Sequence, residues 1–129
     1  MNLQTTPSFT YQKKVFDGFE TALVMVLIQD LIPFQDRSDF LAAFSDHEQQ
    51  TFSAPKGLHS WAARYAAKRA AEILSGEYWH SFEVIRWPDS PPRLHKRQDQ
   101  SDHPLECYSL SLSHDEPFAA AYLSKTVPS

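Results

Sequence analysis

Three cations lie close together in the stretch ARYAAKRAAEIL (63–74), whose composition predicts a helix. Arg64 and Lys68 are four residues apart and share a face, whereas Arg69 lies about 100° around the axis from Lys68. Cations on a rigid element suit a phosphate-bearing ligand, because arginine offers a bidentate fork and lysine a point charge. The alternative is a solvated face on which Lys68 pairs with Glu72. The stretch alone leaves both interpretations open.

Asp30 is the second group that could do chemistry. It lies near the end of TALVMVLIQDLIPF (21–34), an apolar run that predicts a buried strand stopped by Pro33. Because burying an unpaired carboxylate is costly, we expect a cation, a metal or hydrogen-bond donors beside Asp30. Magnesium is usually held by one or two carboxylates and substrate phosphates, so a second carboxylate must converge on Asp30 to favour a metal site. A turn or a helix cap is the alternative.

A third candidate lies at the end of CYSLSLSH (107–114). This segment alternates strictly, with His114 on the apolar side and Ser113 on the serine side, and it predicts a strand. At the strand end, these two side chains could present an imidazole and a hydroxyl to a phosphate. A histidine at the edge of the core is the alternative.

The helix that carries the cations is the most clearly patterned element, over about Ser60–Leu74. Gly76 follows it, where a left-handed cap is expected. Before this helix, a short helix opens at residues 36–38. A capping box at Ser45–Glu48 then begins a second short helix over about residues 46–52.

The rest of the chain predicts strands and connecting segments. The other expected strands cover residues 79–87, 93–95 and 118–127. Residues 1–14 are expected to be a polar lead-in, and 96–104 a surface loop. Together these elements predict a single α+β domain over residues 1–129.

Composition excludes several classes of protein. A net charge of -4 argues against a nucleic-acid-binding protein, whose surface would be basic. The single cysteine, Cys107, cannot form an intramolecular disulfide, which favours a reducing compartment. The longest apolar run, ALVMVLI (22–28), is far shorter than the roughly 20 residues of a membrane helix, and no signal peptide is evident. We therefore expect a cytoplasmic protein that contacts no membrane.

Taken in order, these motifs resemble the holo-(acyl-carrier-protein) synthase type of phosphopantetheinyl transferase. The resemblance extends from about residue 24 to residue 123 and preserves the spacing between motifs. It is carried by Asp30, Ser45-Asp46-His47-Glu48, Ala63-Arg64-Tyr65-Ala66-Ala67-Lys68, Gly76, Phe82-Glu83-Val84, Ser111-Leu112-Ser113-His114 and Ala119-Ala120-Ala121.

The resemblance implies a function and a fold. Members of this family transfer the 4'-phosphopantetheine arm of coenzyme A to a serine of an apo acyl carrier protein, in fatty acid or polyketide biosynthesis. The implied fold is a small antiparallel sheet packed on one long helix and short helices, assembled as a homotrimer with sites between subunits. Phosphoryl transfer of this kind depends on positioning and on charge neutralisation by the metal and the cations.

Residue by residue, the resemblance makes Asp30 a Mg²⁺ ligand. It makes Arg64, Lys68 and Gly76 part of the coenzyme A site, of which Ser113 and His114 would form a wall.

The chain departs from the family pattern at this same site. The glutamate that follows the helix lysine in the family, a magnesium ligand, is Arg69 here, and a second lysine one turn on is Ile73. The glycine-rich turn keeps Gly76 but continues with Glu77 and Tyr78.

Three further family positions near Asp30 are altered. A glycine is Ile28, a glutamate is Pro33, and a basic residue at the carrier-protein surface is Asp36, with Arg37 adjacent.

Three interpretations remain open. Glu72, about 60° around and about 4.5 Å along the axis from Arg69, could reach the metal from the next turn and join Asp30 and Lys68 as a catalytic residue. Alternatively, Arg69 could replace the metal, either by binding the diphosphate of coenzyme A or by pairing with Asp30. In the third, the chain binds a carrier protein or a biosynthetic partner without transfer.

Overall fold

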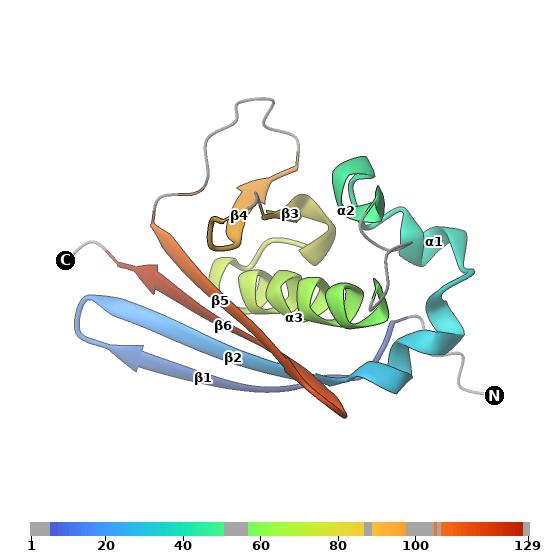
Figure 1. Ribbon diagram of the computed structural model, residues 1–129. Coiled ribbons are helices and arrows are strands. Elements are labelled where there is room, and N and C mark those ends of the chain that lie inside the picture. The colour runs from blue at the N-terminus through green and yellow to red at the C-terminus, as the bar shows by residue number, and fades with distance from the viewer. Residues whose placement is uncertain (1–5, 51–56, 87–88, 98–104, 106, 128–129) are drawn as a thin grey trace.

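The protein is described by a computed structural model, which covers residues 6–50, 57–86, 89–97, 105 and 107–127. It is an α+β structure in which one long helix lies between a four-stranded sheet and a smaller layer of short helices and a two-stranded hairpin (Figure 1). None of the described helices is both long and apolar enough to cross a membrane.

The main sheet is antiparallel, with the strand order β1-β2-β6-β5. Its strands are β1 (Thr10–Phe16), β2 (Phe19–Leu27), β5 (Tyr108–Asp115) and β6 (Phe118–Thr126). The predictions of strands at 107–114 and 118–127 are confirmed. Part of the expected polar lead-in over 1–14 is a strand, because residues 10–16 form a hairpin with β2 through a turn at Gly18, whose φ is 90°. Residues 1–5 lie outside the described part of the chain.

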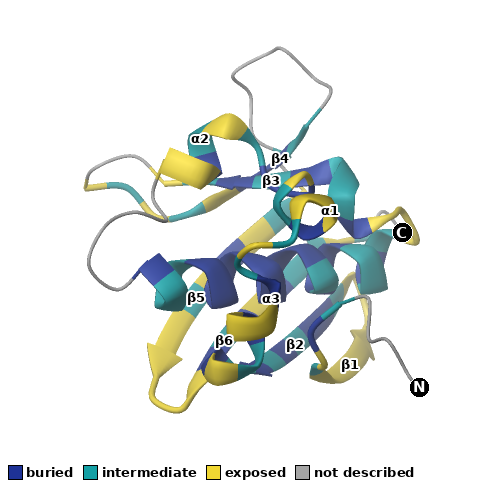
Figure 2. Cartoon of the chain, turned by 90° about the vertical axis from the view of Figure 1, so that its right-hand side faces the viewer, coloured by how far each residue is buried: buried dark blue, intermediate teal, exposed yellow. Residues whose placement is uncertain are grey.

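The inner face of the sheet packs against α3 (Gly57–Ser75). Small residues on both sides allow the helix and the sheet to approach closely, and the buried alanines are Ala22 on β2, Ala119 and Ala121 on β6, and Ala62, Ala63, Ala66, Ala67, Ala70 and Ala71 on α3. Figure 2 shows α3 buried along most of its length and β1 exposed at the edge of the sheet.

The apolar run that contains Asp30 does not remain a strand to its end. β2 ends at Leu27, and residues Ile28–Phe34 form the 3₁₀ helix η1. Ile28, Leu31 and Phe34 are its buried residues, and their spacing of three matches the three residues per turn of a 3₁₀ helix. Asp30 therefore lies on a helical turn beyond the strand. At the junction, the amide of Ile28 donates to the carbonyl of Pro117, at 2.9 Å.

The short helices α1 (Ser38–Leu41) and α2 (Asp46–Gln50) follow, and residues 51–56 are outside the described part. The predicted capping box is confirmed, because the Glu48 amide donates to Ser45 Oγ at 3.2 Å and the Ser45 amide donates to Glu48 Oε1 at 3.0 Å. Phe40 of α1 lies within an aromatic cluster whose other members are Phe34, Phe44, Trp61, Tyr65 and Trp79.

The prediction of a long helix ending before Gly76 is also confirmed. Gly76 has a φ of 77°, and its amide donates to the Glu72 carbonyl at 2.9 Å. The strand expected over 79–87 begins later, because Trp79–Ser81 form the 3₁₀ turn η2, which β3 (Phe82–Ile85) follows.

The short return strand is β4 (Arg93–Lys96), and it pairs with β3. Lys96, expected in the loop 96–104, therefore belongs to a strand. Residue 87, the last of the strand expected over 79–87, and residues 98–104 of the expected loop lie outside the described part.

Candidate functional site

Lys68 lies in the interior rather than on a solvated face. Its Nζ is 2.6 Å from Glu48 Oε1 and donates to the Ala43 carbonyl at 2.7 Å. Both charged side chains have no exposed surface. The alternative in which Lys68 pairs with Glu72 on a solvated face is therefore wrong, because the lysine pairs with Glu48 of α2 and Glu72 is engaged by Arg69. In this structure Lys68 offers no surface to a phosphate.

Glu48 links three elements of the fold. Besides Lys68 of α3 and the Ser45 amide of its own helix, it accepts a hydrogen bond from the Val84 amide of β3 at 3.1 Å. From the sequence, Glu48 is assigned only to a capping box, and that pattern explains its backbone contact but not its ion pair. The large apolar Phe44, four residues earlier and buried, is a further signal that Glu48 could face the interior.

Arg64 is also largely buried, with 7% of its surface exposed. Its Nη1 donates to the Ser60 hydroxyl, and its Nε is 3.9 Å from Glu48 Oε2. Burial lowers the pKa of Arg64, Glu48 raises it and Arg86 lowers it further. Both cations of the expected phosphate face thus converge on one internal carboxylate.

Burial lowers the pKa of Lys68 from 10.5 to about 8, against the opposing effect of Glu48. Between these two values the unfolded chain binds more protons than the folded chain, so this group makes the free energy of unfolding rise with pH. Between pH 8 and 10.5, we expect the free energy of unfolding of the native protein to rise by at most about 3 kcal/mol relative to that of the Lys68→Met variant. Urea denaturation of both proteins at each pH measures this difference, and a difference that does not change with pH would contradict the assignment.

Arg69 is held in place on all sides. Its Nη1 donates to Glu72 Oε1 at 2.7 Å, its Nε to the Tyr65 hydroxyl at 3.1 Å and its Nη2 to Thr6 Oγ1 at 3.0 Å. The guanidinium carbon also lies 4.9–5.4 Å from the ring centroids of Phe9, Tyr65 and Trp79. Arg69 is thus a packed cation, with 12% of its side chain exposed.

Glu72, the carboxylate that could join Asp30 at a metal, is engaged by other groups. Both oxygens of Glu72 have partners, since Oε1 pairs with Arg69 and Oε2 accepts from the Trp79 amide at 3.1 Å. Asp30 is half-buried on η1, and Arg69 forms no ion pair with it. Within the described ranges, no group of three histidine, cysteine, aspartate or glutamate side chains is placed to hold a metal. Mg²⁺ binding at Asp30 and Glu72 therefore stays a prediction from the resemblance.

Ser113 and His114 are exposed near the end of β5, beside the first turn of α3. The His114 ring is 5.4 Å from the His59 ring, and His59 Nε2 is 2.7 Å from Glu116 Oε1. Glu72 lies 13 residues after His59 on the same helix, which is about 20 Å along the axis. One copy of the chain therefore does not bring His114 and Glu72 into one site, and the homotrimer implied by the resemblance stays a prediction.

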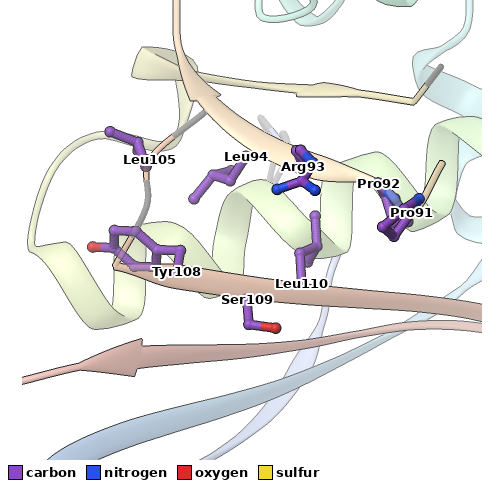
Figure 3. A pocket seen from close by; sticks show the side chains of 8 residues that line it. All are labelled: Pro91, Pro92, Arg93, Leu94, Leu105, Tyr108, Ser109 and Leu110. Atoms are coloured by element: carbon purple, nitrogen blue, oxygen red, sulfur yellow. The ribbon is translucent and has the colours of Figure 1, made fainter. Parts of the chain in front are cut away.

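Two hollows on the surface are lined by residues other than Asp30 and Arg69. A cavity of about 380 Å³ lies between β4 and β5, and Figure 3 shows its lining of Pro91, Pro92, Arg93, Leu94, Leu105, Tyr108, Ser109 and Leu110. Burial raises the pKa of Tyr108 to about 12, so its phenol stays protonated at neutral pH. A second hollow, of about 400 Å³, is lined by Arg97 and by three residues that come shortly after Gly76 in the sequence, Tyr78, His80 and Ser81.

Several solved structures share this fold. The chain resembles an acyl carrier protein synthase–coenzyme A complex from Chronobacterium ammoniagenes, with a TM-score of 0.61 and 20% identity over 94% of this chain and 99% of the other. It also resembles the acyl carrier protein synthase of Mycobacterium tuberculosis, with a TM-score of 0.61 and 23% identity over 86% and 97% of the two chains. No family model and no curated protein sequence matches the chain. The chain therefore has the fold of an acyl carrier protein synthase, which confirms the fold implied by the sequence resemblance.

Proposed function

We propose that this chain binds an acyl carrier protein and does not transfer the phosphopantetheine arm of coenzyme A to it. The fold supports the partner, because its structural neighbours are acyl carrier protein synthases, one of them in complex with coenzyme A. The environment of Arg69 supports the loss of transfer. This residue stands where the resembled family has a metal-binding glutamate, and it pairs with Glu72, the carboxylate that could have compensated.

The two cations expected to bind phosphate also support the loss of transfer. Arg64 and Lys68 keep the residue types of the family, but both are directed at the buried carboxylate of Glu48. Both carboxylate oxygens of Glu72 are also engaged. The structure therefore supports neither phosphate binding by Arg64 and Lys68 nor metal binding by Glu72. Binding to a partner needs only the outer surface of the fold.

Calorimetry with a panel of apo carrier proteins tests the binding part of the proposal. We expect the same affinity in Mg²⁺ and in EDTA, because no carrier contact is expected to run through a metal. Arg37 adjoins the position of the basic residue that meets the carrier in the resembled family, and carrier proteins of this kind are acidic. Arg37→Glu should therefore weaken binding about tenfold.

The matched control is Arg93→Glu, which reverses an exposed charge on a different element, β4. Equal losses from the two charge reversals would indicate non-specific attraction. Absence of binding to every carrier in the panel would overturn the proposed partner.

A further inference from the structure

The segment Thr6–Phe9, which we call the strap, crosses from the sheet to α3. Thr10 pairs with Met25, so the chain before β1 continues beyond that point toward the end of β2. η1, which carries Asp30, begins immediately after β2. Hydrogen bonds from Tyr65 and Arg69 to Pro7 and Thr6 place the strap against α3. The strap thus lies against the helix near the junction from which Asp30 projects.

The strap is docked by several contacts of different kinds. Pro7 is buried, and its carbonyl accepts a hydrogen bond from the Tyr65 hydroxyl at 2.5 Å. The Phe9 ring packs edge-on against Tyr65, with centroids 6.2 Å apart and an interplanar angle of 82°. Thr6 Oγ1 accepts from Arg69 Nη2 at 3.0 Å, and the Arg69 guanidinium lies 5.1 Å from the Phe9 centroid.

Arg69 is the point at which the strap and the helix meet. On the helix side, Glu72 neutralises its charge and the Tyr65 hydroxyl accepts from its Nε. On the other side, the strap supplies only a neutral hydroxyl acceptor and an aromatic ring. A phosphate oxygen is a stronger acceptor for a guanidinium than a hydroxyl, because its hydrogen bonds are assisted by charge on both partners.

We propose that the strap is a removable cover on an anion site centred on Arg69. While the strap is docked, the donor of Arg69 that faces it is occupied by Thr6, and phosphate-bearing ligands cannot reach the guanidinium. When the strap leaves α3, this donor becomes available to the diphosphate of a ligand such as coenzyme A. The inference concerns anion binding to Arg69, so it stands or falls separately from carrier-protein binding.

The test uses the full-length chain with the substitutions Thr6→Val and Phe9→Ala together, which remove the hydroxyl acceptor and the ring but leave Arg69 intact. Hydrogen–deuterium exchange of the amides of Thr6, Ser8 and Phe9 in the native chain reports whether the strap is docked, and the same positions are followed in the variant. Calorimetry measures the affinities for coenzyme A and for inorganic diphosphate. We expect faster exchange at these positions and about tenfold tighter binding of both ligands, since ligand no longer competes with the strap.

Two further variants give the comparison. Adding Arg69→Gln to the strap variant should abolish the gain in affinity. Phe16→Ala removes an exposed aromatic ring at the opposite end of β1, where it stacks on Phe19, and should change neither exchange nor affinity.

Three outcomes would overturn the proposal. Faster exchange without tighter binding would show that the strap has only a structural role. A gain in affinity that survives Arg69→Gln would place the anion site elsewhere. Unchanged exchange in the strap variant would show that Thr6 and Phe9 do not hold the strap.

Discussion

Replacement of Glu48 by glutamine is expected to lower the free energy of unfolding by about 3–5 kcal/mol, because it leaves the ammonium group of Lys68 buried without a compensating charge. Both side chains are fully buried, so water cannot replace the lost partner. The new amide group of glutamine also has to meet two backbone donors, the amides of Ser45 and Val84, which now bond separate carboxylate oxygens. Urea denaturation of the native protein and the variant measures the loss.

The control for this substitution is Glu77→Gln. Glu77 pairs with Lys96 on the surface, where the two side chains are 49% and 32% exposed, and its loss should cost less than about 1 kcal/mol. Combining Glu48→Gln with Lys68→Met should destabilise less than the sum of the single substitutions, by up to about 3 kcal/mol. A loss for Glu48→Gln as small as that for Glu77→Gln would contradict a buried ion pair.

The elements with a clear pattern could be predicted from the sequence. The stripe of the long helix and the alternation of residues 107–114 are local periodicities, and the cap at Gly76 is a local backbone signal; the structure confirms all three. β1 was harder to predict, because all seven of its residues are exposed and neither face of the strand carries a periodic apolar signal.

The environment of the cations could not be derived in the same way. Helical spacing places Arg64 and Lys68 on one face, but it does not say whether that face meets solvent or another element. The answer depends on Glu48, 20 residues before Lys68, and on β3, which the chain reaches only after α3. Arg69 likewise depends on Thr6, 63 residues away. Long-range partners of this kind leave no periodic signal in the sequence.

The second large effect expected is the absence of transfer. The reaction requires neutralisation of charge on the transferred group by the metal and by cations. Removal of one such stabilising group typically lowers a catalytic rate by about 10²–10³. Here Arg69 replaces one expected ligand, Glu72 is engaged by Arg69 and Trp79, and Lys68 is engaged by Glu48. We therefore expect no detectable modification of a carrier protein, and Asp30→Ala should not reduce the signal further.

The most direct measurement is the intact mass of an apo carrier protein after incubation with this chain, coenzyme A and Mg²⁺. The panel should be the one used for calorimetry, so that every carrier tested for transfer has also been tested for binding. An active acyl carrier protein synthase, added to the same mixtures, provides the positive control. The expected result is an unchanged mass for a carrier that binds. A gain of one phosphopantetheine arm that Asp30→Ala abolishes would contradict the proposal, since it would require a working metal site beside Asp30.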